Sequence, residues 1–146
     1  MLLGAKLTVF VEERELGGVY GADTTYLIGA NQRLPDVSFV AAARIPADGD
    51  PEGMWQLAPD LAVEVVSPND LYEKVGDKVL EYLAAGVKQV WIVSTKQRSV
   101  TIYRSPVDVQ IFSGDAELVS EDLLPGFRCR LSDIFKTPTQ TQSPNL

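Results

Sequence analysis

The chain has 146 residues, enough for one domain with a hydrophobic core. It contains no histidine and a single cysteine, Cys129, which excludes Ser-His-Asp triads, cysteine–histidine dyads, histidine-bound zinc and internal disulfide bonds. The net charge of −7 disfavours a broad electrostatic attraction to DNA or to anionic lipid. Carboxylates, lysines, hydroxyl groups and metal ions that prefer oxygen ligands remain as the available chemistry.

The first third of the chain predicts one helix followed by short strands. Apolar residues at helical spacing indicate a helix over residues 2–16, which Gly17-Gly18 ends. The segment from Arg44 to Gln56 is rich in proline, glycine and polar residues, and this composition is typical of a surface loop. Between the helix and this loop we expect strands around residues 19–20, 25–28 and 36–42.

Residues 61–93 carry the clearest pattern. Leu61 to Val66 is a nearly continuous apolar run rich in β-branched residues, as expected for a central strand covered on both faces. Ser67-Pro68-Asn69-Asp70 has the features of a capping box and predicts a helix from Pro68 to about Ala85, ended by Gly86. A second β-rich run covers residues 87–93. This order predicts a βαβ crossover between parallel strands.

The C-terminal part is expected to add further strands to this unit. A turn at Leu124-Pro125-Gly126-Phe127 leads into a last apolar segment, residues 131–135. The polar tail, residues 137–146, is expected to be disordered. Strands are expected at residues 99–103 and, more weakly, at 109–112 and 117–119.

Neither a membrane span nor a secretory signal is visible in the sequence. The longest apolar run, Leu61 to Val66, is much shorter than a bilayer requires, and Glu64 interrupts it. The N-terminus lacks the charged start and the long apolar core of a signal peptide. We therefore expect a cytoplasmic protein with no membrane partner.

Glu64 breaks the pattern of its own strand. An ionised carboxylate in a buried strand is costly unless a cation or a metal ion faces it. A single glutamate in a strand usually faces solvent, but its neighbours on the same face, Ala62 and Val66, are apolar. The pattern therefore favours a functional site at Glu64.

Two further polar residues stand out, Lys78 and Asp36. Lys78 falls within the apolar stripe of the expected helix, together with Leu71 and Tyr82. Extension of the lysine side chain to solvent explains this position equally well. Asp36 follows Pro35 at the start of a strand, where a simple turn residue would be the first interpretation. The spacing permits contact between a lysine on the helix and a carboxylate on the preceding strand.

The order of these residues resembles a known family. The sequence is similar to the Uma-type restriction-endonuclease family of the PD-(D/E)xK nuclease superfamily, over roughly residues 15–136. Single PD or ExK fragments are weak signals, whereas an ordered series of motifs is specific. The series consists of Leu34-Pro35-Asp36-Val37, Glu64-Val65-Val66-Ser67-Pro68, Lys78 with Tyr82, Gly86-Val87, Val90-Trp91 and Leu124-Pro125-Gly126-Phe127.

The resemblance implies a single α/β domain over residues 1–136, with a restriction-endonuclease-like αβββαβ core, a mixed central sheet and extra C-terminal strands. It implies that Asp36, Glu64 and Lys78 are catalytic. Asp36, Glu64 and the backbone carbonyl of Val65 would hold one or two Mg²⁺ or Mn²⁺ ions, which suit oxygen ligands. The implied reaction is hydrolysis of DNA phosphodiester bonds, in which the metal activates water and a lysine assists.

Two features depart from the family pattern. The usual lysine of the superfamily lies two residues after the second carboxylate, where this chain has Val66, and Lys78 matches the branch with its lysine on the helix. Family members usually begin with an additional segment that carries an acidic residue. This chain is expected to lack that segment, so that it is truncated or Glu12, Glu13 or Glu15 takes its place.

The sequence also leaves an alternative function open and predicts self-association. The main alternative is a non-catalytic relative that acts as an interaction or assembly protein, which the acidic charge favours. A nucleotide-binding βαβ unit is disfavoured because Ser67-Pro68-Asn69-Asp70 contains no glycine for a phosphate loop. Leu80 faces away from the core stripe, and Trp91 and Tyr103 flank the late strands, so leftover apolar surface predicts a homodimer or higher homo-oligomer.

Overall fold

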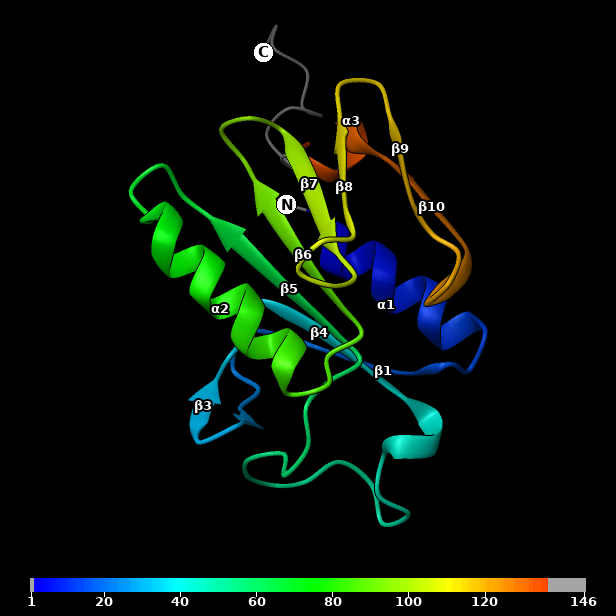
Figure 1. The fold of residues 1–146 in the computed structure, drawn as a ribbon. Coiled ribbons are helices and arrows are strands. Elements are labelled where there is room, and N and C mark those ends of the chain that lie inside the picture. The colour runs from blue at the N-terminus through cyan, green and yellow to red at the C-terminus, as the bar shows by residue number, and fades with distance from the viewer. Residues whose placement is uncertain (1, 137–146) are drawn as a thin grey trace, which may run out of the picture.

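The structure is a computed structural model and describes residues 2–136; the tail that we expected to be disordered lies outside these residues. None of the helices in this part of the chain is long and apolar enough to span a membrane. The elements, shown in Figure 1, are α1 (Leu3–Glu13), β1 (Gly17–Tyr20), β2 (Tyr26–Ile28), β3 (Asn31–Arg33), β4 (Val37–Ala41), the 3₁₀ helix η1 (Ala42–Arg44), β5 (Leu61–Val66), α2 (Tyr72–Ala84), β6 (Gln89–Ser94), β7 (Ser99–Tyr103), β8 (Val109–Ser113), β9 (Glu117–Ser120), β10 (Leu124–Arg130) and α3 (Leu131–Ile134).

A six-stranded mixed sheet forms the centre of the fold, in the order β1-β4-β5-β6-β7-β8. β5 and β6 are parallel and are joined by α2, which confirms the predicted βαβ crossover. The other neighbouring strands of this sheet are antiparallel. The series α1-β1-β4-β5-α2-β6 gives the expected αβββαβ core, with β7 to β10 as the additional strands.

The alternation of side chains along β5 separates two apolar clusters. Leu61 and Val63 point to the face covered by α1 and by the β9–β10 hairpin, where the larger cluster lies. Ala62 points to the opposite face, where it packs with Val79 and Tyr82 of α2. Figure 1 shows α1 and α2 on opposite sides of the sheet. Glu64 shares the parity of Ala62, so its side chain faces α2.

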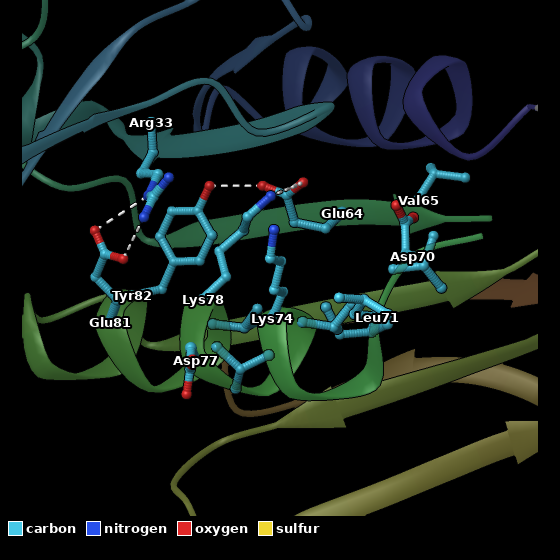
Figure 2. A pocket seen from close by; sticks show the side chains of 15 residues that line it. Arg33, Glu64, Val65, Asp70, Leu71, Lys74, Asp77, Lys78, Glu81 and Tyr82 are labelled. Carbon is cyan, nitrogen blue, oxygen red and sulfur yellow. Dashed lines mark hydrogen bonds and ion pairs between the residues drawn. The ribbon is translucent and has the colours of Figure 1, made fainter. Parts of the chain in front are cut away.

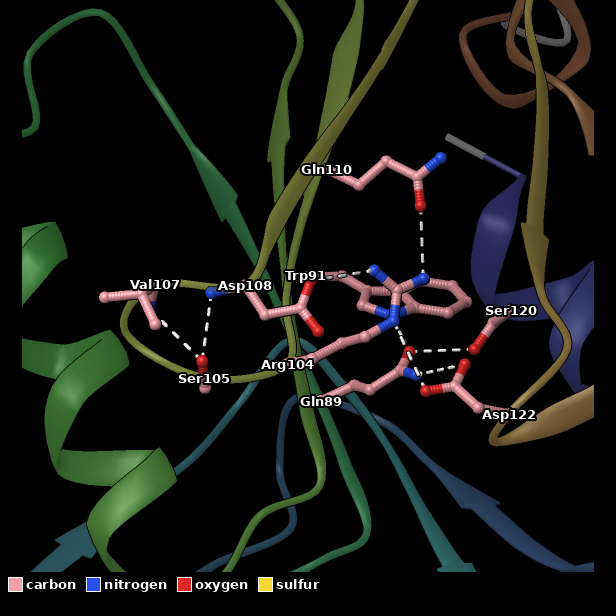
Figure 3. Close-up of polar contacts among 9 residues, drawn as sticks. All are labelled: Gln89, Trp91, Arg104, Ser105, Val107, Asp108, Gln110, Ser120 and Asp122. Carbon is pink, nitrogen blue, oxygen red and sulfur yellow. Dashed lines mark hydrogen bonds and ion pairs between the residues drawn. The ribbon is translucent and has the colours of Figure 1, made fainter.

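A buried hydrogen-bond network attaches the β9–β10 hairpin to the central sheet. Gln89 is 1% exposed, and its Oε1 accepts hydrogen bonds from Trp91 Nε1 at 3.0 Å and from Ser120 Oγ at 2.8 Å. Its Nε2 donates to Asp122 Oδ1 at 2.9 Å (Figure 3). Since both ends of the amide are paired, these hydrogen bonds offset the cost of burying Gln89. Trp91, which we expected at the surface, is fully buried in this region.

The predicted start of α2 is wrong. The capping-box interpretation places the helix start at Pro68, whereas α2 begins at Tyr72, after Leu71 in an extended conformation. Ser67 N donates to Asp70 Oδ2 at 2.7 Å, and Asp70 N donates to Ser67 O at 3.0 Å. The capping residues therefore close a turn that precedes the helix, which shortens α2 at its N-terminus.

Two segments expected to be irregular contribute to the core. Trp55, in the predicted surface loop, is 2% exposed and forms a β-bridge with Tyr26. Its ring stacks in tilted geometry on Tyr26, at 5.9 Å between centroids. Leu124 to Phe127, expected to be a turn, begins strand β10, with a register shift between Leu124 and Arg128. In both cases tertiary packing outweighs the local composition.

Candidate active site

Glu64 lies in the fourth position of β5 and is 8% exposed. The strand is buried from Leu61 to Glu64, so the alternation that turns Ala62 toward α2 also fixes the direction of Glu64. A carboxylate in this position has lost most of its contact with water. Its charge therefore depends on the side chains that face it.

Two side chains of α2 contact the Glu64 carboxylate. Tyr82 OH donates a hydrogen bond to Oε2 at 2.6 Å, and Lys78 Nζ lies 3.5 Å from Oε1. Because Lys78 and Tyr82 are four residues apart, one helix face presents both groups to the strand. Figure 2 shows the three side chains meeting between α2 and β5. The Glu64–Lys78 pair that the spacing allowed is present.

Burial raises the pKa of Glu64 above its ordinary value of 4.5. The hydrogen bond from Tyr82 and the charge of Lys78 act in the opposite direction, and the charge of Asp36 adds to the increase. Desolvation of Glu64 therefore contributes more to its raised pKa than repulsion between the two acids does. Burial and the Glu64 charge also raise the pKa of Tyr82, which keeps its phenol protonated as a donor.

Asp36 directly precedes β4 and lies beside Glu64. In the antiparallel register Val37 pairs with Val63, so continuing the ladder by one residue places Asp36 opposite Glu64, on the same face. Asp36 Oδ2 accepts a hydrogen bond from the backbone N–H of Val65 at 2.7 Å. This bond fixes the Asp36 carboxylate just before the first residue of β4, next to the strand that carries Glu64.

The backbone carbonyl of Val65 points to the same edge of β5. In an extended strand the N–H and C=O of one residue face the same neighbour. Since the Val65 N–H is directed at Asp36, the Val65 carbonyl oxygen also faces this side of β5. Asp36 thus lies on the side of β5 that faces β4, and Glu64 precedes Val65 in β5.

A groove of about 390 Å³ runs between α2 and the sheet and reaches Glu64. Its apolar part includes Val90 and Ile92 of β6, and its polar part mixes both charges. The basic lining residues are Arg33, Lys74 and Lys78, and the acidic ones are Glu64, Asp70, Asp77 and Glu81. Figure 2 shows the side chains that line this groove.

An ion pair closes one end of the groove and was not anticipated from the sequence. Arg33, at the end of β3, donates to both carboxylate oxygens of Glu81, from Nε at 3.1 Å and from Nη2 at 2.7 Å. Asn31 Nδ2 donates to Glu81 Oε1 at 3.0 Å. The pair connects the β2–β3 hairpin to α2. Asp36 follows Arg33 by three residues in the chain. The pair therefore helps to set the position of Asp36 relative to α2.

A second buried carboxylate, Asp60, lies at the other end of β5 and serves the fold. Its Oδ2 accepts from Ala41 N at 2.7 Å and lies 3.0 Å from Arg44 Nη1. Its Oδ1 lies 3.3 Å from Lys88 Nζ. These contacts join the end of β4, η1 and the segment before β6. Neither Asp60 nor Asp36 is among the residues that line the groove.

The donor set at Glu64 fits a divalent cation. Two carboxylates and a backbone carbonyl provide oxygen ligands, which Mg²⁺ and Mn²⁺ prefer. Within residues 2–136 no cluster of three or more His, Cys, Asp or Glu side chains has metal-binding geometry. Such a site would therefore depend on the Val65 carbonyl and on water besides Asp36 and Glu64. A bound cation would also offset the desolvation that raises the pKa of Glu64.

The fold has a close structural counterpart. The crystal structure of a protein described as a "putative nuclease belonging to DUF820" from Anabaena variabilis ATCC 29413 superposes with a TM-score of 0.80. It covers 90% of this chain and 75% of its own chain, at 21% sequence identity. The match establishes the nuclease-like fold. A search of curated proteins gives no match.

The family follows from the sequence as a whole. The model of the Uma2 family, described as "Putative restriction endonuclease", matches residues 1–132. The chain therefore belongs to the Uma2 family, as the motif series predicted. At the level of the family, this membership supports a nuclease.

Proposed function

We propose that this protein is a metal-dependent endonuclease that hydrolyses phosphodiester bonds of DNA. The observation that carries the proposal is the position of Glu64. Its buried carboxylate lies opposite Asp36 in the continued register, 3.5 Å from the Lys78 ammonium, and in the lining of the groove. Carboxylates and a lysine around one buried point suit the handling of a charged phosphodiester.

Each residue has a distinct task in this proposal. Asp36, Glu64 and the Val65 carbonyl hold Mg²⁺ or Mn²⁺, as one or two ions, which when bound supplies activated water and neutralises charge on the scissile phosphate. Tyr82 orients the Glu64 carboxylate through its 2.6 Å hydrogen bond. Lys78 places a positive charge beside Glu64, where it stabilises negative charge that develops on the phosphate.

The second candidate function is that of a non-catalytic member of the family. The net charge of −7 favours it, since a polyanion is repelled by most of the surface. Such a protein would keep the fold and a metal site without hydrolysing DNA. The two candidates differ in catalysis, so an activity assay separates them.

The test is cleavage of plasmid DNA with Mg²⁺ or Mn²⁺, compared with the same reaction in EDTA. We expect metal-dependent cleavage by the parent protein and a rate lower by about 100-fold or more in Lys78→Met, because one charge-stabilising group is lost. Lys6→Met is the matched control, since Lys6 lies on α1 on the opposite face of the sheet. Absence of cleavage by a folded, metal-binding parent would support the non-catalytic candidate.

A homodimer is part of the same proposal. Trp91 no longer supports it, because that side chain is fully buried. Leu80 is 50% exposed, as its position on the helix predicted. The outer strand β8 adds support, since its residues carry no charge and Ile111 is 66% exposed. Unprotected edge strands favour pairing, and two copies of β8 related by a two-fold axis would extend the sheet.

A further inference from the structure

Lys74 lines the groove beside the candidate active site and has no assigned task. It lies one helical turn before Lys78 on α2, and Figure 2 shows both side chains extending from the helix toward Glu64. The two positions are about 6 Å apart along the helix axis. Lys74 therefore borders the path by which a substrate would reach Glu64.

The other two cations of the groove are already paired. Lys78 lies beside Glu64, and Arg33 is held by Glu81. Among residues 2–136, Lys74 has no carboxylate within ion-pair distance. In Figure 2 the side chain of Asp77, three residues along the helix, points away from that of Lys74. Lys74 is thus the groove's cation available to an external anion.

Two electrostatic effects make this position unfavourable for a lysine in the free protein. Lys74 is the third residue of α2, where the positive end of the helix dipole disfavours a cation. It is also four residues from Lys78, and like charges at this spacing repel each other. Within residues 2–136 no ion pair of Lys74 offsets these effects. A residue that breaks local rules without internal compensation points to a role in binding.

We propose that Lys74 binds a backbone phosphate of DNA adjacent to the one at the Glu64 site. This inference rests on the proposed function and names a substrate contact that lies outside the Asp36–Glu64–Lys78 set. The acidic chain leaves few sites for a polyanion, so one unpaired lysine at the groove contributes measurably to binding. Since a phosphate contact carries no sequence information, Lys74 affects affinity equally for different DNA sequences.

The experiment measures binding of a fluorescently labelled DNA duplex by anisotropy, in Ca²⁺ buffer between about 50 and 200 mM KCl. Lys74→Gln should weaken binding by about two- to fivefold, as for one solvent-exposed ion pair. It should also reduce the slope of log affinity against log salt by about 1. Lys74→Arg should retain the slope of the parent, and Lys6→Gln is the matched control on the opposite face of the sheet.

Thermal melts separate binding from a structural role. Because Lys74 is unfavourable in the free protein, Lys74→Gln should melt at the same temperature as the parent or higher. An unchanged salt slope in Lys74→Gln, an equal loss in Lys6→Gln, a lower melting temperature, or no binding by the parent would each overturn the inference. Failure of the proposed catalysis would appear separately, as absence of metal-dependent cleavage while the Lys74 effect on binding persists.

Discussion

Glu64 combines an unfavourable environment with two favourable contacts. Burial opposes its charge, whereas Tyr82 and Lys78 stabilise the ionised form. In the absence of metal the balance leaves the pKa of Glu64 raised. The same carboxylate therefore lowers the stability of the metal-free protein at neutral pH and gains most from a bound cation.

Replacing Glu64 with glutamine should leave the metal-free protein as stable as the parent, or more stable by up to about 1 kcal/mol. A buried charge is removed, Tyr82 can still donate to the amide oxygen, and Lys78, whose side chain is 39% exposed, remains hydrated. The folded parent binds more protons than the unfolded chain between pH 4.5 and the raised pKa of Glu64. Its stability should therefore fall as the pH rises through this range, and Glu64→Gln should remove that decrease.

Lys78→Met should behave differently. The aliphatic part of the side chain is kept, but Glu64 loses the cation beside it, so stability should fall by about 1–2 kcal/mol. Breaking a fully buried pair costs about 3–5 kcal/mol, and the partial exposure of Lys78 reduces this value. Urea unfolding of both variants in EDTA provides the measurement. Equal destabilisation by both substitutions, with no stabilisation of the parent by Mg²⁺, would leave Glu64–Lys78 as a structural ion pair only.

The sequence identified those residues whose type conflicts with their surroundings. Glu64 stands in an apolar strand and Lys78 in an apolar helix stripe, so both were visible as anomalies. The donor role of Tyr82 was not visible, because a tyrosine fits an apolar stripe as a packing residue. Arg33 lies in a short polar segment, and its partner Glu81 is 48 residues away. Such a pair depends on the tertiary fold.

At the scale of the elements, strands with β-branched runs between clear turns were predicted well. β5 and β7 have the expected limits, residues 61–66 and 99–103. β3 was missed because its three residues are polar, and β10 was missed because Pro125 and Gly126 indicate a turn. The register shift in β10 accommodates these two residues within a strand.

Helix α2 brings the functional groups to the sheet. Lys74, Lys78 and Tyr82 follow one another at intervals of four residues, so they share one face of the helix. The turn closed by Ser67 and Asp70 lies between β5 and this helix. The sequence indicated a helix that starts at the Ser67–Asp70 motif, but this motif forms a turn before the helix. Of the two hydrogen bonds of a capping box, the one from Ser67 N to the Asp70 carboxylate is present, whereas Asp70 N donates to the backbone carbonyl of Ser67 and not to its hydroxyl group.

At the scale of the whole molecule, the βαβ unit and the family motifs predicted the αβββαβ core. The order of the strands in the sheet was not predicted, and only the structure shows it. β1 pairs with β4 across the inserted β2–β3 hairpin, and no local pattern specifies this. The oligomeric state also belongs to this scale. The proposed homodimer rests on the β8 edge, which the structure identified, and on Leu80, whose exposure followed from its position on the helix.

Light scattering at micromolar concentration tests the homodimer. We expect twice the chain mass of 16.0 kDa for the parent. Ile111→Lys should give a monomer, because a charge on the β8 edge opposes strand pairing. Val9→Lys, at an exposed position on α1, is the control and should remain dimeric. A monomeric parent would rule out the dimer without affecting the active-site proposal.

The central claim is that Asp36 and Glu64 form one binding site for a divalent cation. Titration calorimetry with Mn²⁺ tests it most directly, with the parent protein, Asp36→Asn, Glu64→Gln and the control Asp60→Asn, which alters a buried carboxylate that precedes β5 and is paired with Arg44. The account predicts binding by the parent that is lost in both Asp36→Asn and Glu64→Gln and retained in a folded Asp60→Asn. A parent that binds no Mn²⁺ or Mg²⁺, or binding unchanged in Asp36→Asn and Glu64→Gln, would contradict it.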